Sequence, residues 1–408
     1  MKILLVNKFH YLRGGSEKYY FELGNLLKEN GNEVAYFSMQ DKKNISTGNK
    51  EYFVEPIDLN NGSKLKALDI IYSKANYKKM CEAIDDFKPD IIHLNNFQRQ
   101  LSASIVKAAE NKNVPMVFTA HDVQAICPEI SMLDSNGNIC EECLKGKYKN
   151  CIKKSCVHNS RAKSMLGAIE NQYYRKNKVY SEKISHIITP SEFYKTEFIK
   201  DGIDKEKITA IHNYIELEDY SVKNEDENYI LYFGRLAKEK GILYLLKAIS
   251  KARKEIENIK LYIAGTGPEE EKIKEIISRN KLEQNVKLLG FLNHDKVKEY
   301  ISKSSIVVVP SIWYENCPYS VLETQAIGKP IIGSNLGGIP ELVKDNENGM
   351  IYKHNDTDEL ANKILELYKN DELKKKFSKN AKEYAKNEYN KENYYKEIMN
   401  IYKGVVKK

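Results

Sequence analysis

The sequence predicts an α/β fold built from two Rossmann-like, doubly wound domains. Its 408 residues are about twice what one hydrophobic core usually supports. Short β-rich runs alternate with amphipathic helical stretches along the chain, and we interpret the polar segment 216–228 between the two series as a linker. This alternation favours parallel sheets covered by helices, with ligands at the carboxyl ends of the strands.

The individual elements follow from apolar runs of strand length. We expect buried parallel strands at residues 2–6, 33–38, 90–94, 115–119 and 185–189, and again at 229–233, 260–264, 286–289, 305–309 and 330–333. The pattern of residues 16–29 predicts a helix that stops before Gly31. The expected division is an N-terminal domain over 1–212 with a Cys- and Lys-rich insertion at 127–160, a C-terminal domain over 213–387, and a helix over 388–408 that packs back on the first domain.

The composition is that of an ordinary globular protein, with 41% hydrophobic and 30% charged residues. This excludes collagen-like, disordered and membrane-spanning classes for the chain as a whole, since its apolar runs fall well short of the roughly 18 residues a spanning helix needs. At the N-terminus, the apolar run 3–6 is followed by polar Asn7 and Lys8, which indicates a buried strand and not a secretory signal. We therefore expect a cytoplasmic protein.

The positive charge is concentrated in one segment. The chain carries a net charge of +8, and the segment 144–183 alone holds eleven Lys or Arg and two Glu. Such a segment can attract phosphates, acidic lipids or nucleic acid, or it can be a solvated helix surface. We expect an anionic membrane surface as a partner and no nucleic acid.

Five of the seven cysteines fall within thirty residues, as a cluster at Cys127, Cys140, Cys143, Cys151 and Cys156. Cys140 and Cys143 have the spacing of a zinc knuckle, and Cys151 and Cys156 would complete four thiolates. The overall spacing is not a standard one for zinc. A structural zinc site and reduced thiols in an insertion loop both remain open, while a disulfide framework is disfavoured.

Glycines and cations follow three of the predicted strands. Gly14 and Gly15, in the sequence NKFHYLRGGSE, let the backbone approach a ligand just before a helix begins. This is not the GxGxxG fingerprint, so a nicotinamide-dependent oxidoreductase is disfavoured. In the second half, FGRLAKEKG places Arg235 and Lys240 where a diphosphate would need two cations, and AGTGP places Gly265 at the same edge.

The most specific pattern is ENCPYSVLE, which carries Glu315 and Glu323. Pro318 is suited to the first position of a helix and Gly328 to its end, which places Glu315 in the preceding loop and Glu323 inside the helix. Backbone N–H groups around Tyr319 and Ser320 would suit an anion. The two carboxylates could hold sugar or ribose hydroxyls; an ordinary capped helix with two surface carboxylates is the alternative.

Taken together, these motifs resemble those of the retaining glycosyltransferases of family 4, which have the GT-B fold. The resemblance is carried by GGSE, FGRLAKEKG, AGTGP, the Glu315/Glu323 element and GGIPELV, in the family's order, from Gly14 to Val343. It implies two Rossmann-like domains facing across a cleft. The second domain would bind a nucleotide-sugar donor, and the first would bind the acceptor. Thr324 stands where alanine is commoner in the family.

The resemblance also implies roles for single residues. Arg235 and Lys240 would bind the donor diphosphate, Glu323 the ribose hydroxyls and Glu315 the transferred sugar. Gly15 would bring a backbone N–H to the phosphate. His121, in the sequence Thr-Ala-His-Asp at the end of a strand, matches the family's histidine beside the reacting sugar.

The functional expectation is transfer of a sugar from a nucleotide-diphosphate sugar to a saccharide or lipid-linked acceptor, with retention of configuration. The setting would be cell-surface polysaccharide synthesis, peripheral on the inner face of the membrane. Arg235, Lys240 and the helix N-terminus can neutralise the leaving diphosphate, so we expect no cofactor for catalysis. The alternative is a non-catalytic protein that binds nucleotide-sugars or polyanions.

Overall fold

The computed structural model describes residues 1–57, 66–223 and 225–407, and it forms two compact units. Unit 1 comprises Met1–Ile211 together with Glu392–Lys408, and unit 2 comprises His212–Lys391. The boundary between the two units falls after Ile211, where the sequence predicted it after residue 212. The chain returns to unit 1 at Glu392, where the sequence predicted residue 388. Asn224, in the segment interpreted as a linker, and Lys408, the last residue of the expected terminal helix, lie outside the described residues.

Unit 1 contains a seven-stranded parallel sheet in the order β3-β2-β1-β4-β5-β6-β7. Its strands are β1 (Lys2–Val6), β2 (Glu33–Met39), β3 (Lys50–Val54), β4 (Ile91–Leu94), β5 (Met116–Thr119), β6 (His186–Thr189) and β7 (Ile208–Ala210). The strand order reverses between β1 and β4. In open parallel sheets, ligands bind outside the carboxyl ends of the strands at such a point.

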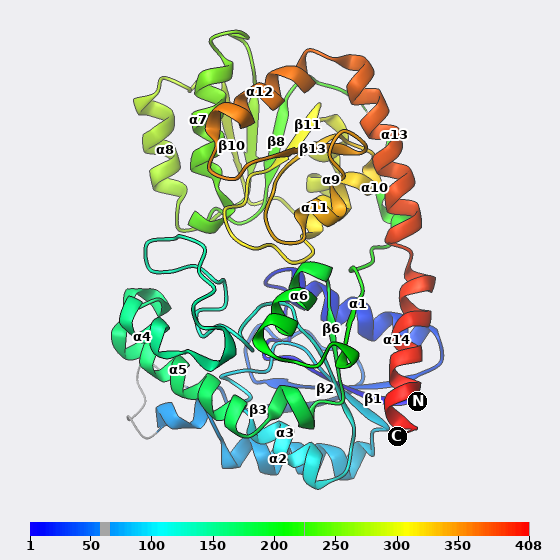
Figure 1. The fold of residues 1–408 in the computed structure, drawn as a ribbon. Helices are drawn as coiled ribbons and strands as arrows, with labels where there is room; N and C mark the ends of the chain where they lie inside the picture. The colour runs from blue at the N-terminus through cyan, green and yellow to red at the C-terminus, as the bar shows by residue number, and fades with distance from the viewer. Residues whose placement is uncertain (58–65, 224, 408) are drawn as a thin grey trace. The chain divides into compact units, whose positions relative to one another are not determined.

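Helices of unit 1 flank this sheet (Figure 1). The helices of the unit are α1 (Gly15–Glu29), α2 (Lys74–Phe87), α3 (Ser104–Asn111), α4 (Lys149–Lys154), α5 (Arg161–Lys176), α6 (Glu192–Asp201) and α14 (Lys391–Val406), and α4 packs on α5. The terminal helix α14 is fixed to unit 1 by tyrosines, because the Tyr394 hydroxyl is hydrogen-bonded to that of Tyr19 and the Tyr402 hydroxyl to His93 Nδ1. The prediction of a helical tail is confirmed.

Unit 2 contains a six-stranded parallel sheet in the order β10-β9-β8-β11-β12-β13. Its strands are β8 (Ile230–Phe233), β9 (Leu261–Ala264), β10 (Val286–Gly290), β11 (Ile306–Val309), β12 (Ile331–Ser334) and β13 (Gly349–Tyr352). Its helices are α7 (Ile242–Ala252), α8 (Glu270–Arg279), α9 (His294–Lys303), α10 (Tyr319–Ile327), α11 (Ile339–Leu342), α12 (Thr357–Tyr368) and α13 (Asp371–Glu388). Here the order reverses between β8 and β11.

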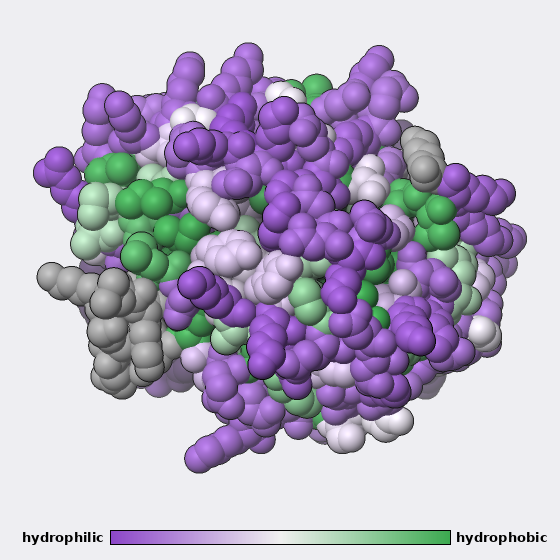
Figure 2. All heavy atoms as spheres, turned by 90° about the horizontal axis from the view of Figure 1, so that it is seen from below, coloured by the Kyte–Doolittle hydropathy of each residue, from purple (hydrophilic) through white to green (hydrophobic). Residues whose placement is uncertain are grey.

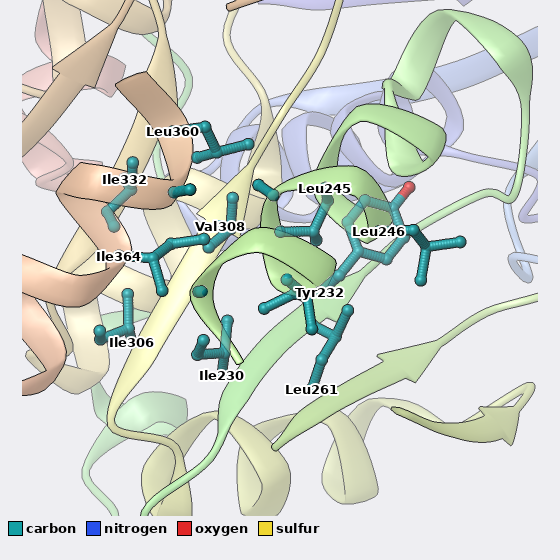
Figure 3. Close-up of a cluster of buried hydrophobic side chains, with 14 of the residues drawn as sticks. Ile230, Tyr232, Leu245, Leu246, Leu261, Ile306, Val308, Ile332, Leu360 and Ile364 are labelled. Carbon is teal, nitrogen blue, oxygen red and sulfur yellow. The ribbon is translucent and has the colours of Figure 1, made fainter. Parts of the chain in front are cut away.

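The core of unit 2 lies on both faces of its sheet. On one face, Leu246 of α7 and Ile364 of α12 belong to the same buried cluster as Ile230 and Val308 of the strands (Figure 3). On the other face, α10 packs against Leu231. Each fully buried aliphatic side chain contributes about 2 kcal/mol. Burial on both faces explains why these strands have continuous apolar sequences.

The segment 216–228 is not a linker, because its described residues belong to unit 2. Tyr220 ends the short 3-10 turn Leu217–Tyr220 and is only 2% exposed, in the cluster that contains the buried face of α10. Further on, the Glu225 backbone N–H donates to the Ser302 carbonyl over 3.0 Å. The polar composition of the segment gave no sign of these contacts with unit 2.

The ten predicted strands are all present, and the described residues form three further strands that were not predicted. These are β3, β7 and β13, and each lies at the edge of its sheet. β3 has the half-exposed pattern of an edge strand, β7 has only three residues, and β13 begins with a glycine. β3 and β7 lack the continuous apolar run of a buried strand, whereas β13 is mostly buried and is only four residues long.

Hydrophilic side chains cover most of the face shown in Figure 2. Among the helices described, none combines the length and the apolar character that crossing a bilayer demands.

The packing of α1 on the sheet of unit 1 leads to a test of the fold. A Cβ on Gly24 would lie 2.1 Å from the Tyr36 hydroxyl oxygen, and Tyr36 is fully buried between the rings of His10 and Tyr20. We expect Gly24→Ala to lower the free energy of unfolding by about 1–3 kcal/mol, since the ring has no room to move.

The matched control is Gly404→Ala in α14, where nothing lies within 4 Å of the added Cβ. It should leave stability unchanged or raise it by up to about 1 kcal/mol, because alanine favours a helix more than glycine does. Urea denaturation of the full chain measures both. Equal effects of the two substitutions would contradict the close contact.

Candidate functional site

The candidate site of unit 2 lies where the strand order reverses, at the carboxyl ends of β8 and β11. The segments that leave these two strands touch. Gly241 has a left-handed backbone with φ +71°, and a Cβ there would lie 1.8 Å from the Pro310 carbonyl oxygen. Only glycine fits this contact, which brings the two loops and their charged side chains together.

The central contact of these loops is an ion pair between Lys240 and Glu315. Lys240 Nζ lies 2.7 Å from Glu315 Oε1, and Ser311 Oγ donates to the same oxygen over 2.6 Å. The ammonium also lies 5.1 Å from the centre of the Trp313 ring. Burial by itself raises the pKa of Glu315, but the Lys240 charge and these hydrogen bonds outweigh it and hold the pKa below its ordinary value. Glu315 is therefore a buried carboxylate that stays ionised.

Arg235 and Gly265 lie in neighbouring loops at the same edge. Arg235 is exposed, and its carbonyl accepts a hydrogen bond from the buried Tyr232 hydroxyl over 2.8 Å. Gly265 has φ +138°, and a Cβ there would lie 1.9 Å from the Gly234 carbonyl oxygen. The glycine thus lets the loop after β9 pack directly on the loop that carries Arg235.

Glu323 lies inside α10, as predicted, and is 8% exposed. The Tyr220 hydroxyl donates to Glu323 Oε1 over 3.1 Å and lies 2.9 Å from His294 Nε2. These two partners were not found from the sequence. Tyr220 lies in a segment interpreted as a linker, and His294 is the first residue of α9, far from any motif.

The ends of α10 agree with the sequence to within one residue. Gly328 ends the helix with φ +83°, as predicted, but Pro318 is the N-cap and Tyr319 is the first helical residue. Tyr319 and Ser320 therefore form the first turn, where backbone N–H groups lack helical partners. This turn carries the partial positive charge expected of a helix N-terminus.

In unit 1, Gly15 and His121 also lie at carboxyl ends of strands. Gly15 is the first residue of α1, after an extended Gly14. His121 follows β5, and its Nε2 lies 2.9 Å from Asn95 Oδ1, so Nε2 carries the proton. Burial lowers the pKa of His121 to about 3, which leaves a neutral imidazole.

The cysteine cluster is a small hydrophobic core. Cys143 and Cys151 are buried in it with Tyr148, and the half-buried Cys156 packs against it; Cys140 is also half-buried. Burial raises the pKa of Cys143 and Cys156 to about 12, so these thiols are protonated. In the described part of the chain, no three His, Cys, Asp or Glu residues are grouped so that they could hold a metal ion. The zinc site remains a prediction that elemental analysis would test.

Part of the basic segment 144–183 is neutralised in the fold. Arg175 pairs with Asp201 over 2.7 Å, Lys183 with Glu110 over 2.9 Å, and Lys154 with Glu142 over 2.7 Å. These three acidic partners lie outside the segment. The net positive charge of the folded region is therefore smaller than the segment's sequence suggests. Binding to an anionic membrane also stays a prediction.

The sequence comparisons agree with this architecture. Residues 13–219 match the family described as "Glycosyltransferase Family 4", and residues 215–384 match "Glycosyl transferases group 1". The chain belongs to glycosyltransferase family 4, as its motifs indicated. The predicted class of two Rossmann-like domains with the GT-B fold is confirmed.

Individual relatives match to different extents. An uncharacterized glycosyltransferase of Methanocaldococcus jannaschii is 33% identical over 179 residues, which cover 44% of this chain and 45% of that protein. The chain thus matches under half the length of this relative. The N-acetyl-alpha-D-glucosaminyl L-malate synthase of Bacillus anthracis is 22% identical over 395 residues, or 97% and 95% of the two chains. The crystal structure of HepE from Anabaena in complex with UDP superposes with a TM-score of 0.72 at 18% identity, covering 99% of this chain and 100% of that one.

The ion pair of unit 2 leads to a stability prediction. Lys240→Met should lower the free energy of unfolding by about 3 kcal/mol, because it leaves the buried Glu315 carboxylate without its counter-charge. Adding Glu315→Gln should restore most of the loss, since the buried charge is then removed. Chemical denaturation of the single and double variants measures this coupling.

Lys251→Met is the matched control, because it breaks an exposed pair with Asp358 whose side chain is 80% exposed. It should cost less than about 1 kcal/mol. A Lys240→Met variant as stable as this control would show that the pair does not hold the loops.

Proposed function

We propose that the chain is a retaining glycosyltransferase that moves a sugar from a nucleoside-diphosphate sugar to a saccharide or lipid-linked acceptor. Unit 2 would hold the donor and unit 1 the acceptor. The observation that carries the proposal is the ion pair of the half-buried Lys240 with the buried Glu315, in the loop that leads into the first turn of α10. A buried, ionised carboxylate next to a cation and a helix N-terminus suits a ligand with both hydroxyls and phosphates.

The donor site of unit 2 would place positive charge next to the leaving diphosphate. Arg235, Lys240 and the first turn of α10 would stabilise the negative charge that develops as the bond from the sugar to the diphosphate breaks. Because Lys240 already pairs with Glu315, the two would act together: the ammonium would bridge the carboxylate and the phosphate. Glu315 would then orient the hydroxyls of the transferred sugar, and Glu323 those of the ribose.

His121 would act as a neutral hydrogen-bonding group beside the transferred sugar. Its pKa of about 3 excludes an imidazolium at neutral pH, so its role would be to orient the sugar and not to donate a proton to the leaving group.

Known relatives support the donor and acceptor classes. The HepE structures contain UDP, UDP-glucose, or UDP and glucose. A structure of S. aureus TarM contains fondaparinux, alpha-GlcNAc-glycerol and UDP. Another relative is named as a poly(ribitol-phosphate) alpha-N-acetylglucosaminyltransferase, and another as an amylovoran biosynthesis glycosyltransferase. These names favour a role in cell-surface polysaccharide synthesis, at the inner face of the membrane if the acceptor is lipid-linked.

The test is release of free nucleotide from a panel of UDP-, GDP- and ADP-sugars, combined with titration of the matching nucleoside diphosphate. Glu315→Gln should lower turnover by about 100-fold while diphosphate affinity is kept or rises, since Lys240 is released from its pair. Arg235→Ala should weaken diphosphate binding by about tenfold through the loss of a charge-assisted contact.

Glu347→Gln is the control, because this exposed carboxylate lies just before β13 begins, at the amino ends of the parallel strands and not at their carboxyl ends. It should change neither quantity. Diphosphate binding without turnover of any donor sugar would favour the non-catalytic binding protein. Loss of diphosphate affinity in Glu315→Gln, with retention in Arg235→Ala, would overturn the assignment of these residues.

A further inference from the structure

Unit 1 has its own reversal of strand order, between β1 and β4, and two cations lie there. Lys8 follows β1 and Arg99 follows β4. The two segments are joined, because the Lys8 backbone N–H donates to the Asn96 carbonyl over 2.7 Å and the Asn96 N–H donates to Asn7 Oδ1 over 3.2 Å. A parallel sheet offers a ligand site at this place.

Arg99 is held in a conformation that arginine rarely adopts. Its φ is +67°, in the left-handed region. Glu170, on α5 and only 1% exposed, fixes it: Oε1 accepts the Arg99 backbone N–H over 3.0 Å, and Oε2 lies 3.6 Å from Nε. Nη2 donates to the Pro128 carbonyl over 3.0 Å. Strained residues of this kind persist only where the surroundings over-determine them, which is typical of ligand sites.

Lys8 carries a half-buried ammonium that lacks a close counter-charge. Among the residues that the structure describes, no carboxylate lies within 4.0 Å of its Nζ and the ammonium donates no hydrogen bond. Burial lowers the pKa of Lys8, Asp122 raises it and Arg99 lowers it further, so the net direction is down. A bound anion would offset this cost of burying a charge.

We propose that Lys8 and Arg99 form an anion subsite at the carboxyl edge of the unit 1 sheet, and that it takes a carboxylate or phosphate group of the acceptor. The inference rests on the proposed function, in which unit 1 holds the acceptor. It narrows the acceptor class from any saccharide or lipid-linked sugar to one that carries an acidic group.

Three carboxylates, those of Asp122, Glu17 and Glu170, interact electrostatically with Lys8, and each has its own partner. Glu17 and Glu170 are buried, and they interact with Ser16 Oγ and Arg99 respectively. Asp122 is half-buried and accepts the Gln124 backbone N–H over 2.9 Å. A ligand at this edge therefore meets the two cations and Asp122. This combination fits an acidic group with a hydroxyl nearby, since the remaining Asp122 oxygen can accept a hydrogen bond from it.

The experiment uses three probes that share a hexose frame: glucose 6-phosphate, glucuronate and glucose. Each is titrated calorimetrically into the full chain saturated with the nucleoside diphosphate, which occupies the cations of unit 2. We expect one or both charged probes to bind at least about tenfold tighter than glucose. The better of the two tells whether the subsite prefers phosphate or carboxylate.

Lys8→Met should lower the ratio of charged-probe affinity to glucose affinity by about tenfold, because it deletes one charge-assisted contact. Lys78→Met is the matched control, since it removes the same charge from an exposed position of α2. Arg99→Met alone would leave Glu170 buried without its partner and could unfold unit 1. The double variant Arg99→Met/Glu170→Gln removes the guanidinium together with its buried acidic partner and should lose the preference as well.

Equal affinity for glucose and the charged probes, no binding of either charged probe, or an unchanged preference in Lys8→Met would each overturn the subsite. If the proposed function is wrong, a separate result shows it: no nucleoside diphosphate binds to the full chain. In that case the same titrations without nucleotide still decide the subsite, because Lys8→Met affects only binding in unit 1.

Discussion

The ion pair between the buried Glu315 and the half-buried Lys240 is the contact around which the loops of unit 2 are arranged. The carboxylate stays charged at 5% exposure only because the ammonium and Ser311 reach it. Lys240 lies in the loop after β8 and Ser311 in the loop after β11, and Gly241 allows these two loops to touch. From the loop after β12, the Gly338 N–H donates to the Glu315 carbonyl over 2.7 Å. Three strand ends therefore meet at Glu315, two through its carboxylate and the third through its backbone carbonyl.

The same topology recurs in unit 1 with different chemistry. Each sheet reverses its order next to its first strand, and each presents cations there: Lys8 and Arg99 in unit 1, Arg235 and Lys240 in unit 2. In both units, one cation is held by a buried glutamate. A donor with a diphosphate and an acceptor with an acidic group would each meet a cation already positioned by the fold, so less ordering would be needed on binding.

The sequence predicted the centres of both sheets and most of the candidate site. The buried strands have apolar runs on both faces, and Gly328 marks the end of α10 by a local requirement for left-handed backbone. Edge strands such as β3 were missed because a half-exposed strand resembles a loop in composition. Tyr220 was missed because it lies in a polar segment where few side chains, among them Leu217 and Val222, pack against the core.

By itself, the sequence determined the fold class, the central strands and the residue types at the strand ends. These depend on local periodicity and on glycine, proline and charge placed within a few positions of one another. The tertiary structure alone decided which charges pair. Lys240 and Glu315 are 75 positions apart, and Arg99 and Glu170 are 71 apart. Their contacts exist because strand order brings distant loops to one edge, and a local pattern carries no information about which strands become neighbours.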